Sequence, residues 1–365
     1  MKLNAKNERI KHRFYAYLRG PHQLDEQSID AAAASIDRFD QHNGRRDFKS
    51  FRPEQADAFQ RALLTHRNAR TGEILSKASL VSILRELKRF FFWLASQPGY
   101  KRLQHDWADH FNPPRKALEV ARARREPRVP TLKQVHDTIA AMPSASPIER
   151  RNRAIVAFTI LTASRVDATA SLRLKHLDVD AGVLHLDGRE VRTKFGKTFE
   201  VTLCPVGGDV EAIVRDWVKY LTAELGFGPN DPLFPATRTG FDKDNLPAEP
   251  TLSRECWSTA DPIRAIFSAA FANAGLPYFN PHSFRHTLAR YATSICRNAE
   301  ELMAWSQNLG HSDMLVTLTS YGSVPFNRQR DLIRSAGRGD EDQRLALDLG
   351  YAALAAARRL APAQD

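Results

Sequence analysis

A histidine and an arginine stand three residues apart in the stretch NPHSFRHTLARYATSIC, which begins at Asn280. Pro281 is expected to open a helix there, so His282 and Arg285 would share one helical face. Together with the positive end of the helix dipole, this pair could hold an anion. His286 makes two histidines four residues apart, as in zinc helices. Because HSFRH lacks the glutamate of HExxH and no third ligand is evident, we predict no metal site.

A second stretch, NLGHSDMLVTLTSYG at 308–322, places a histidine ten residues before a tyrosine. Gly310 suits the left-handed residue that closes a helix, because it has no Cβ to clash. Ser312 could cap the next helix, which would carry the chain on to Tyr321. A tyrosine near a helix end usually has no chemical role and only packs in the core or lies on the surface. The significance of His311 and Tyr321 therefore depends on the other stretches.

Two further cationic positions lie upstream. Arg165 follows a long apolar run, where an unpaired charge is costly, so it must find an anion or a buried carboxylate. Asp167 is the nearest candidate for a purely structural pair. Lys194 and Lys197 flank the expected tip of a β-hairpin in the sequence TKFGK. Lysines at hairpin tips are usually just solvated, so the residues alone leave both roles open.

The C-terminal two thirds of the chain predict a mixed scaffold for these residues. PTLKQVHDTIAAM begins a helix that Thr131 can cap, and a largely buried helix covers 148–163. GVLHLDG and REVRTKFGKTFEVTLCPV alternate in polarity and predict a small antiparallel sheet. Residues 237–262 are poorly patterned and indicate a loop or insertion.

The N-terminal third predicts helices. Segment 26–41 places apolar residues near one face, and Pro53 suits the first turn of another helix. The clearest helix runs from Ser76 to Ser96 and has a continuous apolar stripe. Its aromatic run FFFW at 90–93 fits core packing, although some of these rings could instead face a partner.

The segment from Pro113 to Pro130 has the composition of a basic linker. It has two adjacent prolines and a set of basic residues, namely Arg115, Lys116, Arg122, Arg124, Arg125 and Arg128. Fully extended, it would cover roughly 50–60 Å at about 3.3 Å per residue. It is either a solvated charge run or a strap that crosses a nucleic-acid backbone.

Composition narrows the class of protein. A chain of 365 residues is long for one domain and natural for two, and 42% hydrophobic residues suffice for real cores. The net charge of +11 favours a polyanionic partner, with an ordinary basic protein as the alternative. Three widely spaced cysteines indicate neither a zinc site nor a disulfide scaffold and fit a reducing cytosol. We expect no signal peptide, because the N-terminus is charged throughout, and no membrane span, because no apolar run of about twenty residues occurs.

Taken together, these stretches resemble the tyrosine recombinases, also called the phage integrase family, over about 130–335. The resemblance rests on the arginine after a TxxR turn, the lysine in the TKFGK hairpin, HSFRHTLA, and LGH with a tyrosine ten residues later. The family usually has a glycine one or two residues before the first arginine and a glutamate three after it. Here the stretch is TASRVDA, with Ala168 at the later position, and Gly322 follows the tyrosine where relatives often carry a polar or bulkier residue.

The resemblance implies strand cleavage and rejoining through a covalent 3′-phosphotyrosyl intermediate. It implies six catalytic residues, Arg165, Lys194, His282, Arg285, His311 and Tyr321. Tyr321 would be the nucleophile and Lys194 the general acid for the 5′-oxygen. His282 would assist proton transfer, and His311 would hydrogen-bond a phosphoryl oxygen. Two arginines can bind non-bridging oxygens bidentately, which lysine cannot. A phosphotyrosine link retains the bond energy, so neither ATP nor another cofactor is expected, in keeping with the lack of a GxxxxGK[ST] stretch.

The predicted fold class is mainly α with a small antiparallel β-sheet, arranged as a two-domain DNA clamp. The N-terminal helices resemble, more weakly, the family's core-binding domain. The expected parts are a helical core-binding domain at 1–112, the basic linker at 113–130, a tyrosine-recombinase catalytic domain at 131–338 and a C-terminal tail helix at 339–365. The tail would dock on a neighbouring subunit or on its own domain.

The predicted function is site-specific DNA recombination, as in the integration of a mobile element. The expected partner is double-stranded DNA, bound by a homo-oligomer, a tetramer on paired sites, with accessory DNA-bending proteins as further candidates. The expected location is the cytoplasm, at the nucleoid. Two alternatives remain open: a type IB topoisomerase-like nicking-closing enzyme and a DNA-binding relative that no longer cuts.

Overall fold

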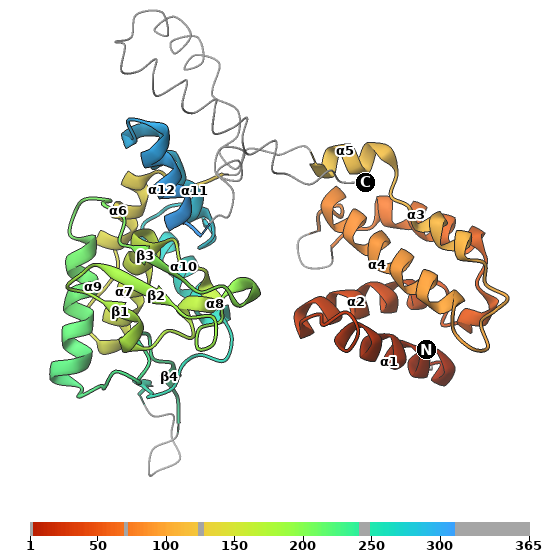
Figure 1. Ribbon diagram of the computed structural model, residues 1–365, viewed down its shortest axis with the longest axis horizontal. Coiled ribbons are helices and arrows are strands. Elements are labelled where there is room, and N and C mark those ends of the chain that lie inside the picture. The colour runs from red at the N-terminus through yellow and green to blue at the C-terminus, as the bar shows by residue number, and fades with distance from the viewer. Residues whose placement is uncertain (1–2, 69–71, 123–127, 241–248, 311–365) are drawn as a thin grey trace, which may run out of the picture. The chain divides into compact units, whose positions relative to one another are not determined.

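A computed structural model describes residues 3–68, 72–122, 128–240 and 249–310 (Figure 1). The chain forms two compact units, Met1–Arg125 and Glu126–Asp365. The predicted fold class is confirmed, because the described residues are mainly helical and the C-terminal unit adds small antiparallel sheets. None of the described helices is long and apolar enough to cross a membrane.

The N-terminal unit is a bundle of helices around α4. Phe90 and Phe91 of α4 belong to its core, whereas Trp93 is half-buried and Phe92 is 55% exposed. The predicted helices at 26–41 and 76–96 are confirmed, and Pro53 is the first residue of α3, as expected. The elements are α1 (Ala5–Arg19), α2 (Glu26–His42), η1 (Phe48–Ser50), α3 (Pro53–Thr65), α4 (Lys77–Ala95), η2 (His105–Phe111) and α5 (Arg115–Arg122).

The segment that has the composition of a basic linker is helical over much of its first half. Residues 115–122 form α5, which packs against α4 through the buried Ala117. Leu118 and Ala121 lie on the same side, so the apolar residues recur at helical spacing between the charged ones. Pro114 stands at the start of the helix, a position that tolerates proline, and its carbonyl accepts the first helical hydrogen bond from Leu118.

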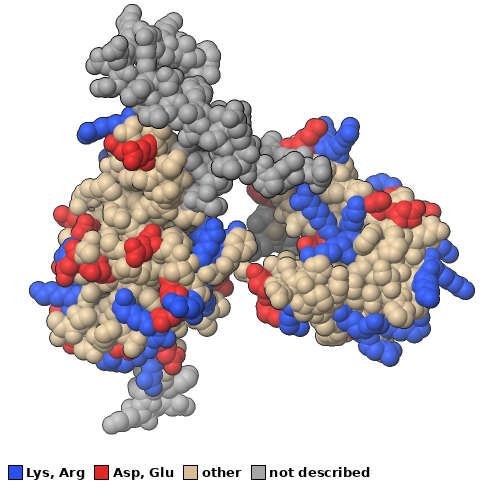
Figure 2. Space-filling view, in the orientation of Figure 1, with Lys and Arg blue, Asp and Glu red and all other residues tan. Residues whose placement is uncertain are grey.

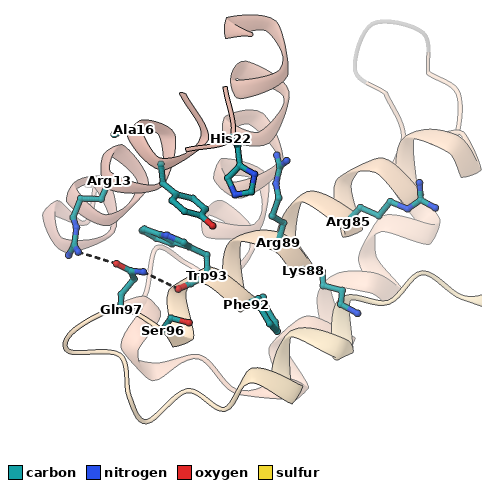
Figure 3. A pocket seen from close by; sticks show the side chains of 11 residues that line it. Arg13, Ala16, His22, Arg85, Lys88, Arg89, Phe92, Trp93, Ser96 and Gln97 are labelled. Carbon is teal, nitrogen blue, oxygen red and sulfur yellow. Dashed lines mark hydrogen bonds between the residues drawn. The ribbon is translucent and has the colours of Figure 1, made fainter. Parts of the chain in front are cut away.

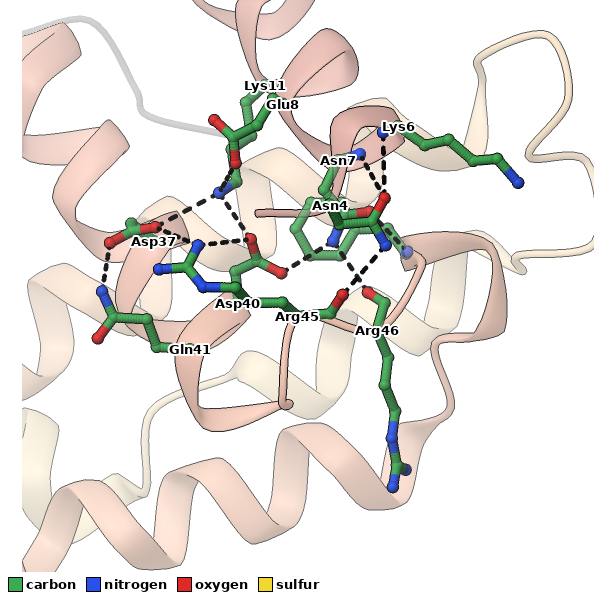
Figure 4. A network of polar contacts seen from close by, with 11 residues as sticks. Asn4, Lys6, Asn7, Glu8, Lys11, Asp37, Asp40, Gln41, Arg45 and Arg46 are labelled. Carbon is green, nitrogen blue, oxygen red and sulfur yellow. Dashed lines mark hydrogen bonds and ion pairs between the residues drawn. The ribbon is translucent and has the colours of Figure 1, made fainter. Parts of the chain in front are cut away.

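A buried ion pair joins α1 to α2 (Figure 4). Lys11 Nζ lies 2.7 Å from Asp40 Oδ2 and 2.9 Å from Glu8 Oε1, and Asn7 donates to Asp40 Oδ1 at 2.8 Å. Asp40 is fully buried. Burial by itself lowers the pKa of Lys11, but hydrogen bonds and charges from Asp40 and Glu8 outweigh it and raise that pKa above its ordinary value. The ion pair therefore fixes the position of α1 relative to α2.

Asp40→Asn is expected to lower the free energy of unfolding of the N-terminal unit by about 3 kcal/mol, because it leaves a buried ammonium without its main counter-ion. Chemical denaturation followed by circular dichroism measures the change. The control is Glu26→Gln, which breaks an exposed pair with Arg19 and should hardly move the midpoint. Equal effects of the two substitutions would show that the buried pair contributes no more than a surface one.

The C-terminal unit is built around α7, which packs against α6, α9, α10 and α11 (Figure 1). The predicted helix at 148–163 and the cap at Thr131 are confirmed, the latter by a reciprocal pair of bonds with Gln134. The helical elements are α6 (Leu132–Ala140), α7 (Pro147–Thr162), α8 (Val166–Thr169), η3 (Leu174–His176), η4 (Lys194–Gly196), α9 (Val210–Lys219), the π-helical η5 (Tyr220–Glu224), α10 (Asp261–Asn273), α11 (Ser283–Ile295) and α12 (Ala299–Asn308).

A three-stranded antiparallel sheet lies beside these helices, as the alternating stretches predict. Its order is β1 (Leu177–Asp178), β2 (Val183–Leu186) and β3 (Phe199–Thr202). Leu184 pairs with Val201 and both are buried, which fixes the face that packs on the core. The segment expected to be a loop at 237–262 instead contains a pair of two-residue strands, β4 (Thr237–Arg238) and β5 (Thr251–Leu252). Strands so short leave no alternating pattern to detect.

Candidate active site

Three of the six predicted site residues line one small pocket of the C-terminal unit. Arg165 stands at the start of α8, Lys194 at the tip of the β2–β3 hairpin and Arg285 in the first turn of α11. A fourth residue, His282, directly precedes α11, and the positive charges of the other three lower its pKa. His311 and Tyr321 lie outside the described residues, as does the predicted tail helix. The fold thus gathers four residues from three stretches that are far apart in the chain.

Arg285 anchors the walls of this pocket. Its side chain is 7% exposed, and its Nη1 donates to the Ala163 carbonyl at 2.7 Å. Its Nη2 donates to the Leu309 carbonyl at the end of α12. The guanidinium therefore joins the turn before Arg165 to the segment that leads directly into His311.

Arg165 has no such anchor. No hydrogen bond or ion pair joins its half-buried guanidinium to another residue in the described part of the chain. Asp167, the candidate for a structural pair, is exposed and forms no ion pair with it among the described residues. Burial lowers the pKa of Arg165 from its ordinary value. A partly desolvated cation without a protein counter-ion is a binding position for an external anion.

The turn before Arg165 has an unusual backbone. Ala163 ends α7 in the left-handed conformation, with φ 51° and ψ 25°. An L-residue with a Cβ pays about 1–2 kcal/mol for this conformation, so glycine is the common choice. Ala163 is fully buried, and its carbonyl accepts the bond from Arg285 described above. The departure from glycine noted in TASRVDA is therefore tolerated without loss of the turn.

His282 is neutral at physiological pH. Desolvation first, and then the positive charges of Arg285, His286, Arg165 and Lys194, lowers its pKa to about 4. Its imidazole can therefore accept a proton or a hydrogen bond near pH 7. Its ring lies 5.5 Å from that of His286, centroid to centroid. Within the described residues, no group of three His, Cys, Asp or Glu side chains is arranged to hold a metal ion.

The two lysines of the hairpin differ in position. Both side chains are exposed, but Lys194 lines the pocket and Lys197 does not. Lys194 Nζ also lies 5.0 Å from the centroid of the Phe195 ring. The preference for Lys194 over Lys197 as the general acid stays a prediction.

Asn308 is a positioning residue that sequence reasoning did not single out. Its Oδ1 accepts from the Thr202 amide at 2.7 Å, and its Nδ2 donates to the Thr202 carbonyl at 2.9 Å. The side-chain amide thus pairs with β3 as a neighbouring strand would. It fixes the end of α12 two residues before Gly310, which has φ 69° as predicted for a helix-closing glycine. A Cβ on Gly310 would lie 2.9 Å from the Phe199 ring, a second reason for glycine there.

Two hydroxyl groups in the pocket were also missed. Ser164 is 6% exposed, and neither its Oγ nor the buried Oγ1 of Thr193 has a hydrogen-bond partner among the described residues. Ser164 directly precedes Arg165, and Thr193 directly precedes Lys194. This adjacency is the only signal in the sequence that could have pointed to the two hydroxyls. Buried hydroxyls without partners carry a cost that a bound ligand can offset.

Ser164→Ala is expected to slow the strand cleavage that the resemblance implies about tenfold without lowering the melting temperature, because it removes a hydroxyl that has no partner among the described residues. Single-turnover cleavage and thermal denaturation measure the two effects. Thr162→Val is the control, since Thr162 Oγ1 already donates to the Phe158 carbonyl and its loss should lower stability. A drop in melting temperature for Ser164→Ala would assign the hydroxyl to folding.

Comparison with known proteins places the chain in a family. The model of the phage integrase family matches residues 129–328, more than half of the chain, and the protein belongs to that family. The tyrosine recombinase XerC of Lactobacillus delbrueckii subsp. bulgaricus is 26% identical over 314 residues, which cover 84% of this chain and 92% of XerC. XerD of Haemophilus ducreyi is 25% identical over 261 residues, covering 70% and 76% of the two chains.

Solved structures with the same fold include two recombinases on DNA. A lambda integrase dimer bound to a COC′ core site matches with a TM-score of 0.57 and 13% identity, over 87% of this chain and 80% of the integrase chain. The XerH recombinase bound to a palindromic difH substrate matches with a TM-score of 0.56 and 14% identity, over 90% and 84% of the chains. At these identities, the likeness supports the architecture.

Proposed function

We propose that this protein is a site-specific DNA recombinase that cuts and rejoins strands through a 3′-phosphotyrosyl intermediate. The observation that carries the proposal is Arg165, a half-buried guanidinium without a protein partner in the described residues, beside Lys194, His282 and Arg285. A phosphodiester is an anion whose in-line transition state carries more charge than its ground state. Preorganised cations around that charge are the main source of catalysis in such sites.

We propose one role for each of the six residues. Arg165 binds a non-bridging oxygen with its guanidinium, and Arg285 adds a second positive charge to the same pocket. The neutral imidazole of His282 takes up the proton that the nucleophile releases. Tyr321 attacks phosphorus, and its hydroxyl must lose a proton because its ordinary pKa is near 10. Lys194 protonates the 5′-oxygen as it leaves, and His311 donates to a phosphoryl oxygen.

The N-terminal unit offers a separate surface for the DNA. A groove between α1 and α4, with a volume of about 970 Å³, combines basic and aromatic side chains (Figure 3). Its lining includes Arg13, Tyr17, Arg85, Lys88, Arg89 and Phe92. Figure 2 shows further Lys and Arg side chains on the visible face of this unit. Cations with interleaved aromatic rings suit a phosphate backbone and exposed base edges.

The decisive experiment traps the intermediate. The full-length protein is incubated with a library of nicked duplexes, in which the fragment released by cleavage diffuses away and leaves the enzyme attached. A covalent protein–DNA band on a denaturing gel supports the proposal, and sequencing the attached DNA identifies the site. A protein that binds DNA but forms no band on any duplex would instead be the inactive relative.

A second experiment separates recombinase from the topoisomerase-like alternative. Two labelled duplexes carrying the recovered site should exchange strands if the protein assembles on paired sites. Relaxation of a supercoiled plasmid without exchange would favour a nicking-closing enzyme. We infer the recombinase because the XerC and XerD relatives, both tyrosine recombinases, match this chain over most of their own lengths. We further propose that the protein assembles as a homo-tetramer on paired sites and acts in the cytoplasm at the nucleoid; the lambda integrase neighbour, a dimer bound to a DNA core site, supports the assembly on DNA.

Lys194→Ala is expected to cut a normal duplex at least about a hundredfold more slowly than wild type and to recover on a 5′-bridging phosphorothiolate. A sulfur leaving group needs no proton, so the substrate bypasses the general acid. Lys197 lies three residues further along the same hairpin. Lys197→Ala should behave like wild type on both substrates. Rescue of Lys197→Ala instead would move the acid to that residue.

A further inference from the structure

The tip of the β2–β3 hairpin displays a large apolar ring to solvent. Phe195 is 83% exposed, the highest value for any large hydrophobic side chain in the described residues. Its backbone is also left-handed, with φ 62° and ψ 25°, a conformation that is a true outlier for a bulky residue. Neither packing nor backbone preference explains a phenylalanine here, whereas glycine would suit both.

The surrounding structure holds the tip in this shape. The Gly196 amide donates to the Thr193 carbonyl at 3.2 Å, and the Gly188 amide donates to Thr198 Oγ1 at 3.0 Å. A Cβ on Gly188 would lie 2.0 Å from the Gly196 carbonyl oxygen, so the two backbones meet closely. Strain that the fold imposes on an exposed residue points to a function for that residue.

The position of the ring identifies its partner. Lys194 lines the anion pocket, so Phe195 stands directly beside the place where the scissile phosphate would bind. A phosphate in duplex DNA joins two nucleosides, and the base of either one offers a flat face to an aromatic ring once it leaves the stack. Lys194 and Lys197 on either side complement the charge of the backbone that carries this base.

We propose that Phe195 is a wedge that stacks against the base flanking the scissile phosphate and draws it out of the duplex stack. This inference rests on the proposed function. In the free protein the ring lies under the Lys194 ammonium, 5.0 Å from it. When the ring moves into the DNA, that contact is released and the ammonium is free to approach the leaving oxygen. Base stacking and placement of the general acid are thereby coupled.

The test uses the full-length Tyr321→Phe protein, which leaves DNA uncleaved, and a duplex of the site recovered by covalent trapping. The fluorescent base 2-aminopurine brightens when it leaves the stack. It replaces the base flanking the scissile phosphate in one duplex and a base several pairs away in another. We expect protein binding to raise the fluorescence several-fold at the flanking position only.

Three variants made in the same protein assign this signal. Phe195→Gly should remove most of it and weaken binding to the site about tenfold, since it deletes one base–aromatic stack. The same variant should raise the melting temperature by about 1–3 °C, because glycine relieves the strained backbone. Phe195→Tyr should keep the signal. Tyr278→Ala, which removes an exposed aromatic ring elsewhere in the unit, should also keep it.

Several results would overturn the wedge. The first is a full fluorescence signal in Phe195→Gly, and the second is an equal signal at the two base positions. The third is a lower melting temperature for Phe195→Gly, which would mean that the ring packs on the protein. A full signal combined with lost cooperative assembly would assign the ring to a second copy of the chain. Failure of the wild type to trap any DNA contradicts the proposed function instead, and it is seen before any Phe195 variant is made.

Discussion

Tyr321→Phe is expected to abolish covalent attachment to DNA while leaving the affinity for DNA within about twofold of wild type. The substitution removes one oxygen atom, which is the atom that would form the bond to phosphorus. Because the proposed intermediate is a phosphotyrosine, we expect no other group of the site to replace this oxygen. Binding comes instead from phosphate contacts spread over both units, so it should survive.

A denaturing gel with a nicked duplex measures attachment, and a gel shift under native conditions measures affinity. The matched control is Tyr291→Phe on α11, which loses only a hydrogen bond from the hydroxyl to the Pro205 carbonyl. It should form the covalent band at nearly normal strength. A band of wild-type strength from Tyr321→Phe would mean that another residue is the nucleophile.

The second large effect is expected at Arg285. Arg285→Lys should reduce the cleavage rate about a thousandfold, or roughly 4 kcal/mol, which is the upper range for loss of one preorganised donor. A single ammonium cannot reach the Ala163 and Leu309 carbonyls together and still face a phosphate. The link between the Arg165 turn and the end of α12 would therefore loosen, and the melting temperature should fall as well.

Arg165→Lys separates the two consequences. Arg165 has no partner among the described residues, so its replacement should slow cleavage by about 10²–10³-fold and leave the melting temperature unchanged. Single-turnover rates and thermal denaturation of both variants give the comparison. A near wild-type rate for either one would show that its guanidinium does not stabilise the transition state.

Several features of the fold could be predicted because they depend on residues close together in the chain. The helices at 26–41, 76–96 and 148–163 have regular apolar spacing, and the cap at Thr131 involves a residue only three positions away. The hairpin around Phe195 was visible for the same reason. Where the local pattern is weak, the sequence does not predict the structure: residues 115–122 of the basic linker form the helix α5, and the expected loop at 237–262 contains the short β4–β5 pair.

The sequence by itself determined which residue types are available for the chemistry and in what order, because spaced motifs such as HxxRH and LGH…Y are local patterns. Only the tertiary structure decided their partners. Arg165 and Asp167 are neighbours in the chain, yet the turn at Ala163 leaves the arginine facing the pocket and the aspartate in solvent. Asn308 meets Thr202 across more than a hundred residues. Contacts of that kind depend on how helices and strands pack together, and no short stretch of sequence encodes them.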